Sequence, residues 1–189
     1  TTDSSFHVTI ECASLGVSWE DDFTGNRFRI PFDITPDAGL SLWSPDTPSL
    51  YDCTITLHTE SREHIDSITA SVGFKTIRIE GNQILLNNSP VTLRGIALHD
   101  ERIGEQGGRT STEAHASQLL DYARRLNCNF IRLAHYPYPE YFLDLCDRMG
   151  LLVWDEIPVY WNIAYHSEQT RTTASKMMEG MVLQDRPHS

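Results

Sequence analysis

The sequence has few basic residues and no long apolar run, and each shortage excludes a class of protein. Its 15 lysines and arginines stand against 26 aspartates and glutamates, and the resulting net charge of −11 repels nucleic acid and anionic membranes. The longest apolar runs span about four residues, whereas a membrane-spanning helix requires roughly 20. We therefore expect neither a nucleic-acid partner nor a membrane partner. Because the first residues include no initiator methionine, basic start or apolar segment, we expect the chain to begin inside a longer protein.

Cysteine is also scarce, with four residues and no CxxC spacing. Disulfide frameworks and zinc sites need more numerous or more closely spaced cysteines, so the sequence favours neither. Unpaired cysteine is among the most buried residue types. We therefore predict four buried free thiols, at Cys12, Cys53, Cys128 and Cys146.

The first part of the chain has the pattern of short strands. With 40% hydrophobic residues, the 189 positions can form one medium domain or two small ones. Apolar and polar side chains alternate over residues 51–58, which is typical of a strand with one buried face. Residues 6–10, 27–34 and 67–79 are further strand candidates, and the prolines within 42–50 indicate a corner. Up to about residue 80 the sequence predicts a small antiparallel β-sandwich without helices.

From residue 82 the pattern changes. Residues 84–91 predict a hairpin about Asn87-Asn88, because asparagine tolerates the positive φ that such turns require. Three strand-plus-helix units follow, with strands predicted at 91–96, 129–134 and 151–154. Strands that alternate with amphipathic helices favour a parallel sheet with right-handed crossovers, and three units correspond to an incomplete (β/α)8 TIM barrel.

Each of the three predicted helices has its own signal. Thr110 and Glu113 form a capping box before the first helix. Gly150 marks the C-terminal end of the second predicted helix. The third has apolar residues at helical spacing, which predict a stripe buried in the core: Ala174, Met177, Met178 and Met181.

In a parallel barrel the functional side chains lie at the carboxyl ends of the strands. Here those positions are His99-Asp100-Glu101, His135-Tyr136 and Asp155-Glu156. Such a set could bind a metal, act as acid and base, or hydrogen-bond to sugar hydroxyls, and a metal is least favoured because no pair has the usual ligand spacing. Neighbours along a strand point to opposite sides, so Asp155 and Glu156 are not expected to face one substrate together unless the strand has already ended.

Aromatic residues follow the third predicted strand, at Trp154, Tyr160, Trp161 and Tyr165. Their rings are expected either to stack on a sugar or to contact the sandwich, and the sequence leaves both open. The six other histidines are predicted to lie at the surface: His7, His58, His64, His115, His166 and His188.

Residues 129–137, Asn-Phe-Ile-Arg-Leu-Ala-His-Tyr-Pro, resemble the signature of glycoside hydrolase family 2, together with the downstream residues Phe142-Leu143, Asp147, Gly150 and 151–154. Residues 93–99, and 42–45 with 50–51, resemble two further segments of this family. The family includes β-galactosidases, β-glucuronidases and β-mannosidases. The sequence departs from the family pattern at Ala97, Leu98, Asp100 and Leu133, and the larger Leu133 is expected to alter the shape of the pocket.

The resemblance implies an immunoglobulin-like sandwich over residues 1–80 and the first three βα units of a TIM barrel over residues 81–189. It also implies a retaining mechanism with two glutamates about 5–5.5 Å apart, both expected beyond the C-terminus of this chain. By the same resemblance Arg132 supports the nucleophile carboxylate, and His99 and His135 contact the glycone. The predicted set of substrate-binding or supporting residues is His99, Arg132, His135, Asp155, Glu156 and Trp161.

The predicted function is therefore that of a fragment of a retaining β-glycosidase, which cleaves O-glycosidic bonds and is inactive by itself. The segment 135–138 slightly favours glucuronidase-like relatives. The alternative is a non-catalytic carbohydrate-binding or degenerate scaffold protein, and a metal-dependent barrel hydrolase ranks third.

The expected partner is a β-linked carbohydrate, no cofactor or metal is expected, and a homo-oligomer stays open. The sequence does not fix the compartment, with a slight preference for the cytoplasm. An incomplete barrel also predicts an unpaired edge on the third strand and exposed apolar flanks on the helices, and therefore aggregation or dependence on a partner.

Overall fold

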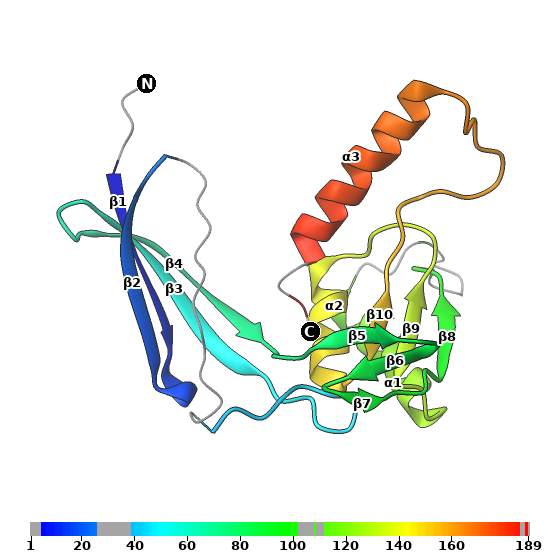
Figure 1. Ribbon diagram of the computed structural model, residues 1–189, viewed down its shortest axis with the longest axis horizontal. Coiled ribbons are helices and arrows are strands. Elements are labelled where there is room, and N and C mark those ends of the chain that lie inside the picture. The colour runs from blue at the N-terminus through cyan, green and yellow to red at the C-terminus, as the bar shows by residue number, and fades with distance from the viewer. Residues whose placement is uncertain (1–4, 26–38, 102–107, 109–111, 186–187, 189) are drawn as a thin grey trace. The chain divides into compact units, whose positions relative to one another are not determined.

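The computed structural model describes residues 5–25, 39–101, 108, 112–185 and 188 (Figure 1). The chain forms two compact units, each of which is described by itself. The first comprises Thr1–Leu42 and Ser49–Phe74, and the second comprises Trp43–Pro48 and Lys75–Ser189. The short segment Trp43–Pro48 thus belongs to the second unit although both of its flanks belong to the first.

The first unit is built on one antiparallel sheet with the strand order β2-β1-β3-β4. Its strands are β1 (Ser5–Cys12), β2 (Val17–Thr24), β3 (Tyr51–Thr59) and β4 (His64–Val72), and the short 3-10 helix η1 (Ala13–Leu15) joins the first two. The strands predicted at 6–10 and 51–58 are confirmed. The single strand predicted at 67–79 is wrong, since β4 ends at Val72 and the next strand belongs to the second unit. The candidate strand at 27–34 lies outside the described residues.

The two faces of this sheet have different chemistry. On one face Cys12, Leu15 and Cys53 form a buried cluster. The other face holds His7, which is only 3% exposed and whose Nδ1 lies 2.8 Å from Oδ1 of Asp22. The prediction that His7 lies at the surface is therefore wrong, because its cross-strand neighbours Asp22 on β2 and His58 on β3 pack against its ring.

The second unit begins with a small antiparallel sheet of β5 (Ile77–Glu80), β6 (Gln83–Leu86) and β7 (Ser89–Pro90). The turn between β6 and β7 is the predicted one, with φ of 51° at Asn87 and 66° at Asn88. The side chain of Asn87 also fixes neighbouring backbone, because its Oδ1 accepts from the amide of Thr76 and its Nδ2 donates to the carbonyl oxygen of Trp43.

A parallel sheet with the order β10-β9-β8 forms the centre of the second unit. It comprises β8 (Gly95–Leu98), β9 (Phe130–Leu133) and β10 (Leu152–Trp154). The predicted parallel pairing is confirmed, but the strand predicted at 91–96 begins only at Gly95. The reason is the side chain of Asn129, which accepts from the amide of Arg94 at 2.7 Å and donates to the carbonyl oxygen of Thr92 at 3.0 Å, replacing ladder bonds there.

Three helices accompany this sheet, α1 (Glu113–Arg125), α2 (Glu140–Met149) and α3 (Glu168–Asp185). Helix α1 is capped by Thr112, whose hydroxyl accepts from the amide of His115. The predicted cap residue Thr110 lies outside the described residues. Helix α2 ends at Gly150 as predicted, and the φ of 69° there is the left-handed conformation that favours glycine.

The core of the second unit lies between the parallel sheet and the first two helices. The side chains of Leu120, Ile131, Leu133 and Phe142 are fully buried there. Leu133 therefore packs in this core, and its effect on the shape of a pocket stays a prediction.

Helix α3 contradicts the prediction of a buried methionine stripe. None of its residues is buried, and Met177 and Met178 are both exposed. The four apolar residues keep their helical spacing, but Ala174 and Met181 are only partly buried, so within the described residues the stripe is not packed into a core.

Two buried contacts secure helix α2. The indole Nε1 of the fully buried Trp43 donates to the carbonyl oxygen of Asp147 at 2.9 Å. The ring of His188 pairs with the carboxylate of Asp147 at 2.9 Å, and this hydrogen bond raises the pKa of His188. His188 was predicted at the surface, but its side chain is only 12% exposed because it docks on α2.

Candidate functional site

The candidate site is a group of polar side chains at the carboxyl ends of β9 and β10. The strand register places Ala97, Arg132 and Trp154 side by side across the three parallel strands. His135 follows β9 and Glu156 follows β10. Because the strands are parallel and adjacent, both of these residues reach the same edge of the sheet.

Glu156 lies at the centre of this group. Its Oε1 accepts hydrogen bonds from Nε of Arg132 at 2.5 Å and from the indole Nε1 of Trp154 at 3.1 Å. Its Oε2 lies 2.8 Å from Nδ1 of His135. One carboxylate therefore joins two strands and orients three side chains; we call Arg132, His135, Trp154 and Glu156 the rim cluster.

The electrostatics of the rim cluster keep Glu156 ionised. The hydrogen bond from Arg132 lowers the pKa of the Glu156 carboxyl, with a further contribution from His135. In return, the carboxylate raises the pKa of Arg132. A carboxyl group held in its charged form can only accept hydrogen bonds, so Glu156 is suited to orienting its neighbours and unsuited to donating a proton.

Two further rings pack on His135. The ring of His99 meets it edge-on at 5.3 Å, and the ring of Tyr160 stacks on it at 5.3 Å and 29°. His99 is exposed, so one of its faces is open to solvent. The imidazole of His135 is thus held by contacts with three side chains, one of which is charged.

Asp155 and Glu156 have different partners although β10 already ends at Trp154, so the alternation along a strand that the prediction used does not reach them. Oδ1 of Asp155 accepts from the amide of Glu156 at 2.8 Å, and its Oδ2 is buried without a donor among the described residues. Burial, together with the carboxyl of Asp185 beside it, raises the pKa of Asp155 to about 7. Asp155 and Glu156 therefore do not form a pair that converges on one substrate.

Other predicted residues are placed differently. Trp161 is 93% exposed, and its indole does not join the rim cluster. Asp100 is buried, and its backbone amide donates to the hydroxyl of Tyr136 at 3.3 Å. Among the described residues, no three histidine, cysteine, aspartate or glutamate side chains are gathered so that they could hold a metal ion. No helix in the described part of the chain is long and apolar enough to cross a membrane.

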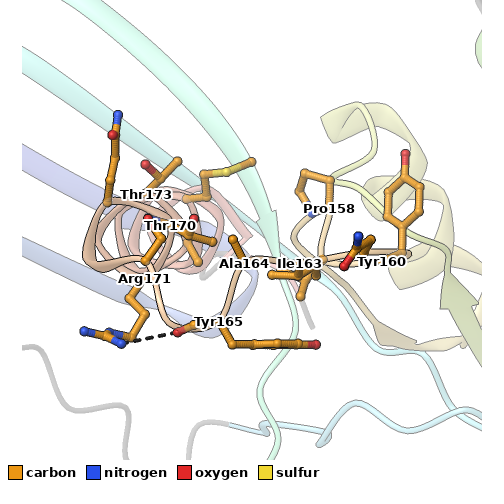
Figure 2. A pocket seen from close by; sticks show the side chains of 14 residues that line it. Pro158, Tyr160, Ile163, Ala164, Tyr165, Thr170, Arg171 and Thr173 are labelled. Carbon is orange, nitrogen blue, oxygen red and sulfur yellow. Dashed lines mark hydrogen bonds between the residues drawn. The ribbon is translucent and has the colours of Figure 1, made fainter.

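A cavity of about 580 Å³ lies beside the rim cluster, between the loop after β10 and the first half of α3. Figure 2 shows Pro158 and Tyr160 at one end and the α3 residues Thr170 and Thr173 at the other. Arg171 closes one side, where its Nη1 donates to the carbonyl oxygen of Tyr165 at 3.2 Å. Tyr160 both lines this cavity and stacks on His135, so this one ring separates the cavity from the rim cluster.

Sequence reasoning missed the specific roles of three residues. Trp154 and Tyr160 were candidates only as aromatic surfaces, whereas the indole N–H of Trp154 binds Glu156 and the ring of Tyr160 orients His135. The register of β9 and β10 could have indicated the first contact. Nothing in the sequence indicated that Asp185, thirty positions away, lies against Asp155.

Comparison with known proteins identifies the family. The family model described as glycosyl hydrolases family 2, TIM barrel domain, matches residues 77–186. The chain belongs to glycosyl hydrolases family 2. A second model, described as glycosyl hydrolases family 2, matches residues 19–75.

The curated relatives of this chain include β-galactosidases. The chain is 32% identical to a β-galactosidase of Thermoanaerobacter pseudethanolicus over 147 residues, which are 77% of this chain and 19% of the relative. It is 40% identical to a β-galactosidase of Aeromonas hydrophila over 115 residues, which are 60% of this chain and 11% of the relative. The chain thus spans less than a fifth of the length of either enzyme.

Solved structures support the same family 2 architecture. A β-glucuronidase of Bacteroides uniformis matches with a TM-score of 0.82 and 25% identity, over 98% of this chain and 23% of the solved chain. A family 2 β-galacturonidase of Eisenbergiella tayi, solved with galacturonate, matches with a TM-score of 0.78 and 28% identity, over 98% of this chain and 32% of the solved chain. Together the matches support a β-sandwich followed by part of a TIM barrel.

Proposed function

We propose that this chain is one part of a retaining β-glycosidase, in which the rim cluster forms a wall of the glycone-binding site. The observation that supports this proposal best is the Glu156 network, which fixes Arg132 and His135 at the carboxyl ends of adjacent parallel strands. Family membership adds the reaction class, hydrolysis of O-glycosidic bonds.

In the proposed arrangement residues 1–80 are an immunoglobulin-like sandwich and residues 81–189 are the first three βα units of the barrel. The catalytic acid/base and nucleophile are two glutamates outside these 189 residues, about 5–5.5 Å apart as retention requires. Glu156 is a positioning residue, because its hydrogen bonds with Arg132 and His135 keep the carboxylate ionised and engage both of its oxygens.

Arg132 has the donors for a second carboxylate. Its Nε is used by Glu156, while within the described part of the chain the N–H groups of its two terminal nitrogens have no acceptor, and 46% of its side chain is exposed. A guanidinium so placed holds a nearby carboxylate ionised by charge and hydrogen bonding, which is what a glycosidase nucleophile requires.

His135 and His99 are proposed to contact the hydroxyl groups of the glycone. With Nδ1–H of His135 donating to Glu156, the neutral ring presents Nε2 as an acceptor for a sugar hydroxyl. When the ring is protonated, both nitrogens donate. His99 lies edge-on to His135 and is exposed, so it is available to contact a neighbouring hydroxyl.

The remaining predicted residues have supporting or peripheral roles in this proposal. Asp155 faces Asp185 and helps to set the path of the chain after β10. Trp161, with its exposed indole, is available to a longer glycoside rather than to the glycone. The names of the relatives point to β-galactosides, β-glucuronides and β-galacturonides as substrates to test.

The proposal can be tested on the chain itself by NMR titration with the methyl β-glycosides of galactose, glucuronic acid and galacturonic acid. We expect the indole N–H of Trp154 to shift, because it donates to the carboxylate of the rim cluster, while that of the buried Trp43 stays in place. The Arg132→Gln variant should lose the shift. If all three glycosides leave Trp154 unchanged up to high millimolar concentration, the proposed glycone site is wrong.

A second experiment separates the enzyme from a non-catalytic carbohydrate-binding protein. The gene is sequenced past the codon for Ser189, and the complete product is assayed with nitrophenyl β-glycosides. Hydrolysis that Arg132→Gln abolishes supports a glycosidase. Binding of the methyl glycosides without any hydrolysis would favour the carbohydrate-binding alternative.

A further inference from the structure

Two of the four cysteines lie against each other in the first unit. Cys12 ends β1 and Cys53 lies in β3, and the pairing of Glu11 with Thr54 places the two cysteines opposite each other on antiparallel strands. Their Sγ atoms are 2.8 Å apart, and both side chains are buried in the same apolar cluster. Cys128 and Cys146, which are also free and buried, belong to the second unit.

This geometry is close to that of a disulfide bond. Opposite residues on antiparallel strands have Cα atoms about 4.5–5.5 Å apart, which lies within the range of about 4.4–6.8 Å that a disulfide bridges. The sulfur atoms have less than an ångström to move, from 2.8 Å to about 2.05 Å. The backbone therefore does not have to move for the bond to form.

We propose that Cys12 and Cys53 form a disulfide bond across β1 and β3 when the chain meets a low-molecular-weight disulfide such as oxidised glutathione, and that they remain a dithiol under reducing conditions. The thiolate of one cysteine attacks a glutathione sulfur, which forms a mixed disulfide and releases one reduced glutathione. The thiolate of the other cysteine then displaces the second glutathione. The two cysteine protons end on the two glutathione thiols, and the oxidised glutathione is reduced by two electrons.

Burial determines when this exchange takes place. Both side chains lie in the buried apolar cluster of the first unit, and burial together with the hydrogen bond that the Cys53 thiol donates to Cys12 raises the pKa of Cys53 to about 12. A buried thiol without thiolate character reacts slowly. The exchange therefore proceeds during folding or during transient opening of this sheet, and the completed bond is protected once the sheet closes.

The bond would stabilise the first unit. It joins positions that are 41 apart in the sequence, and closing a loop of this size restricts the unfolded chain. The prediction is independent of the proposed glycosidase role, because neither cysteine belongs to the unit that contains the rim cluster.

The test refolds the 189-residue chain in oxidised glutathione and, in parallel, in reduced glutathione with a reductant. Free thiols are then trapped with a maleimide under denaturing conditions, and the digested peptides are analysed by mass spectrometry. We expect the oxidised sample to contain a peptide pair joined through Cys12 and Cys53, with Cys128 and Cys146 alkylated. The apparent Tm of the first unit should rise by roughly 10 °C or more and should fall again on reduction.

Matched variants assign the effect. The double variant Cys128→Ala/Cys146→Ala should retain the cross-link, and Cys12→Ala should lose both the cross-link and the rise in Tm. If Cys12→Ala does not fold, the peptide map of the wild-type chain still shows whether Cys12 and Cys53 are joined. Four alkylated thiols after oxidation, glutathione adducts alone on Cys12 and Cys53, or a bond to Cys128 or Cys146 would each overturn the proposal.

Discussion

The carboxylate of Glu156 accepts a 2.5 Å hydrogen bond from Nε of Arg132, and this contact spans the carboxyl ends of two adjacent parallel strands. Neither residue is buried in an apolar core, so the pair is not part of the packing that holds the sheet together. Its effect is to fix two charged side chains at an accessible edge of the sheet. In the proposed glycosidase this pair belongs to the wall of the glycone-binding site.

The first prediction concerns the charge state of Glu156. Replacing Arg132 by glutamine should raise the pKa of the Glu156 carboxyl toward its ordinary range, because the strongest hydrogen bond that lowers it is lost. Carbon-13 NMR titration of the glutamate side chains measures this pKa. Arg125→Gln, at an exposed position on α1, is the matched control and should leave Glu156 unchanged. An unaltered pKa in Arg132→Gln would contradict the role assigned to this hydrogen bond.

The same contact gives a dependence of stability on pH. A carboxyl group whose folded-state pKa is lowered stabilises the fold above its unfolded pKa of about 4.3, and this contribution is lost as the pH falls through the folded value. Wild-type protein should therefore lose stability in acid relative to Arg132→Gln, in which Glu156 has a nearly ordinary pKa. Urea unfolding between pH 3 and pH 6 compares the two proteins.

Asp155 should behave in the opposite way. Its folded-state pKa is raised to about 7, so between about pH 4 and pH 7 the unfolded chain ionises before the folded one and stability falls as the pH rises. Asp155→Asn stays neutral and should be more stable than wild type at pH 8 by about 1 kcal/mol, after allowance for solvent screening of a half-exposed group. Near pH 4 the difference in the free energy of unfolding between Asp155→Asn and wild type should be smallest. Urea unfolding at both pH values measures it, with Asp121→Asn on α1 as control; parallel pH profiles for wild type and Asp155→Asn would refute the assignment.

Two tryptophans provide a test of where packing matters. Trp43→Ala should destabilise the second unit by about 3–5 kcal/mol, because it removes a fully buried side chain and leaves the carbonyl oxygen of Asp147 without its indole donor. Trp161→Ala should change stability by less than about 0.5 kcal/mol, because this side chain is 93% exposed. Chemical denaturation followed by circular dichroism measures both. Equal losses of stability in the two variants would show that the burial of Trp43 does not cause the destabilisation of Trp43→Ala.

Two glycines with similar backbone conformations differ in their surroundings. Gly150 and Gly16 have φ of 69° and 63°, so alanine at either position costs about 1 kcal/mol of backbone strain. At Gly150 a Cβ would also collide with the backbone carbonyl of Pro45, whereas at Gly16 nothing lies within 4 Å of it. We expect Gly150→Ala to lose at least about 2 kcal/mol more than Gly16→Ala. Thermal unfolding of the two variants, side by side, checks this difference.

Much of the fold was predictable because it follows from local patterns. Alternation identified β1 and β3, the Asn87-Asn88 pair identified the hairpin turn, and Gly150 identified the end of α2. The failures have tertiary causes. The start of β8 depends on the side chain of Asn129, which is distant in sequence. His188 was predicted at the surface because the sequence does not show that Asp147 on α2 pairs with its ring.

For the candidate site, sequence indicated the residues and not their contacts. Arg132, His135 and Glu156 do meet at one edge of the sheet, and His99 lies against His135. Parallel strand order predicted His99, His135 and Glu156 at this edge, whereas Arg132 was expected there from the family resemblance. The partner of Asp155 and the exposure of Trp161 depend on the path of the loop before α3, which has no periodic pattern from which to predict it.

The segment Trp43–Pro48 has a practical consequence for dissecting this molecule. It is part of the second unit, yet the chain returns afterwards to the first unit for residues 49–74. A cut at residue 75 would therefore leave the C-terminal piece without the indole that fills its interior and without the proline that covers Gly150. Expressing that piece as an independent module would require the six missing residues to be supplied as a peptide or grafted by circular permutation.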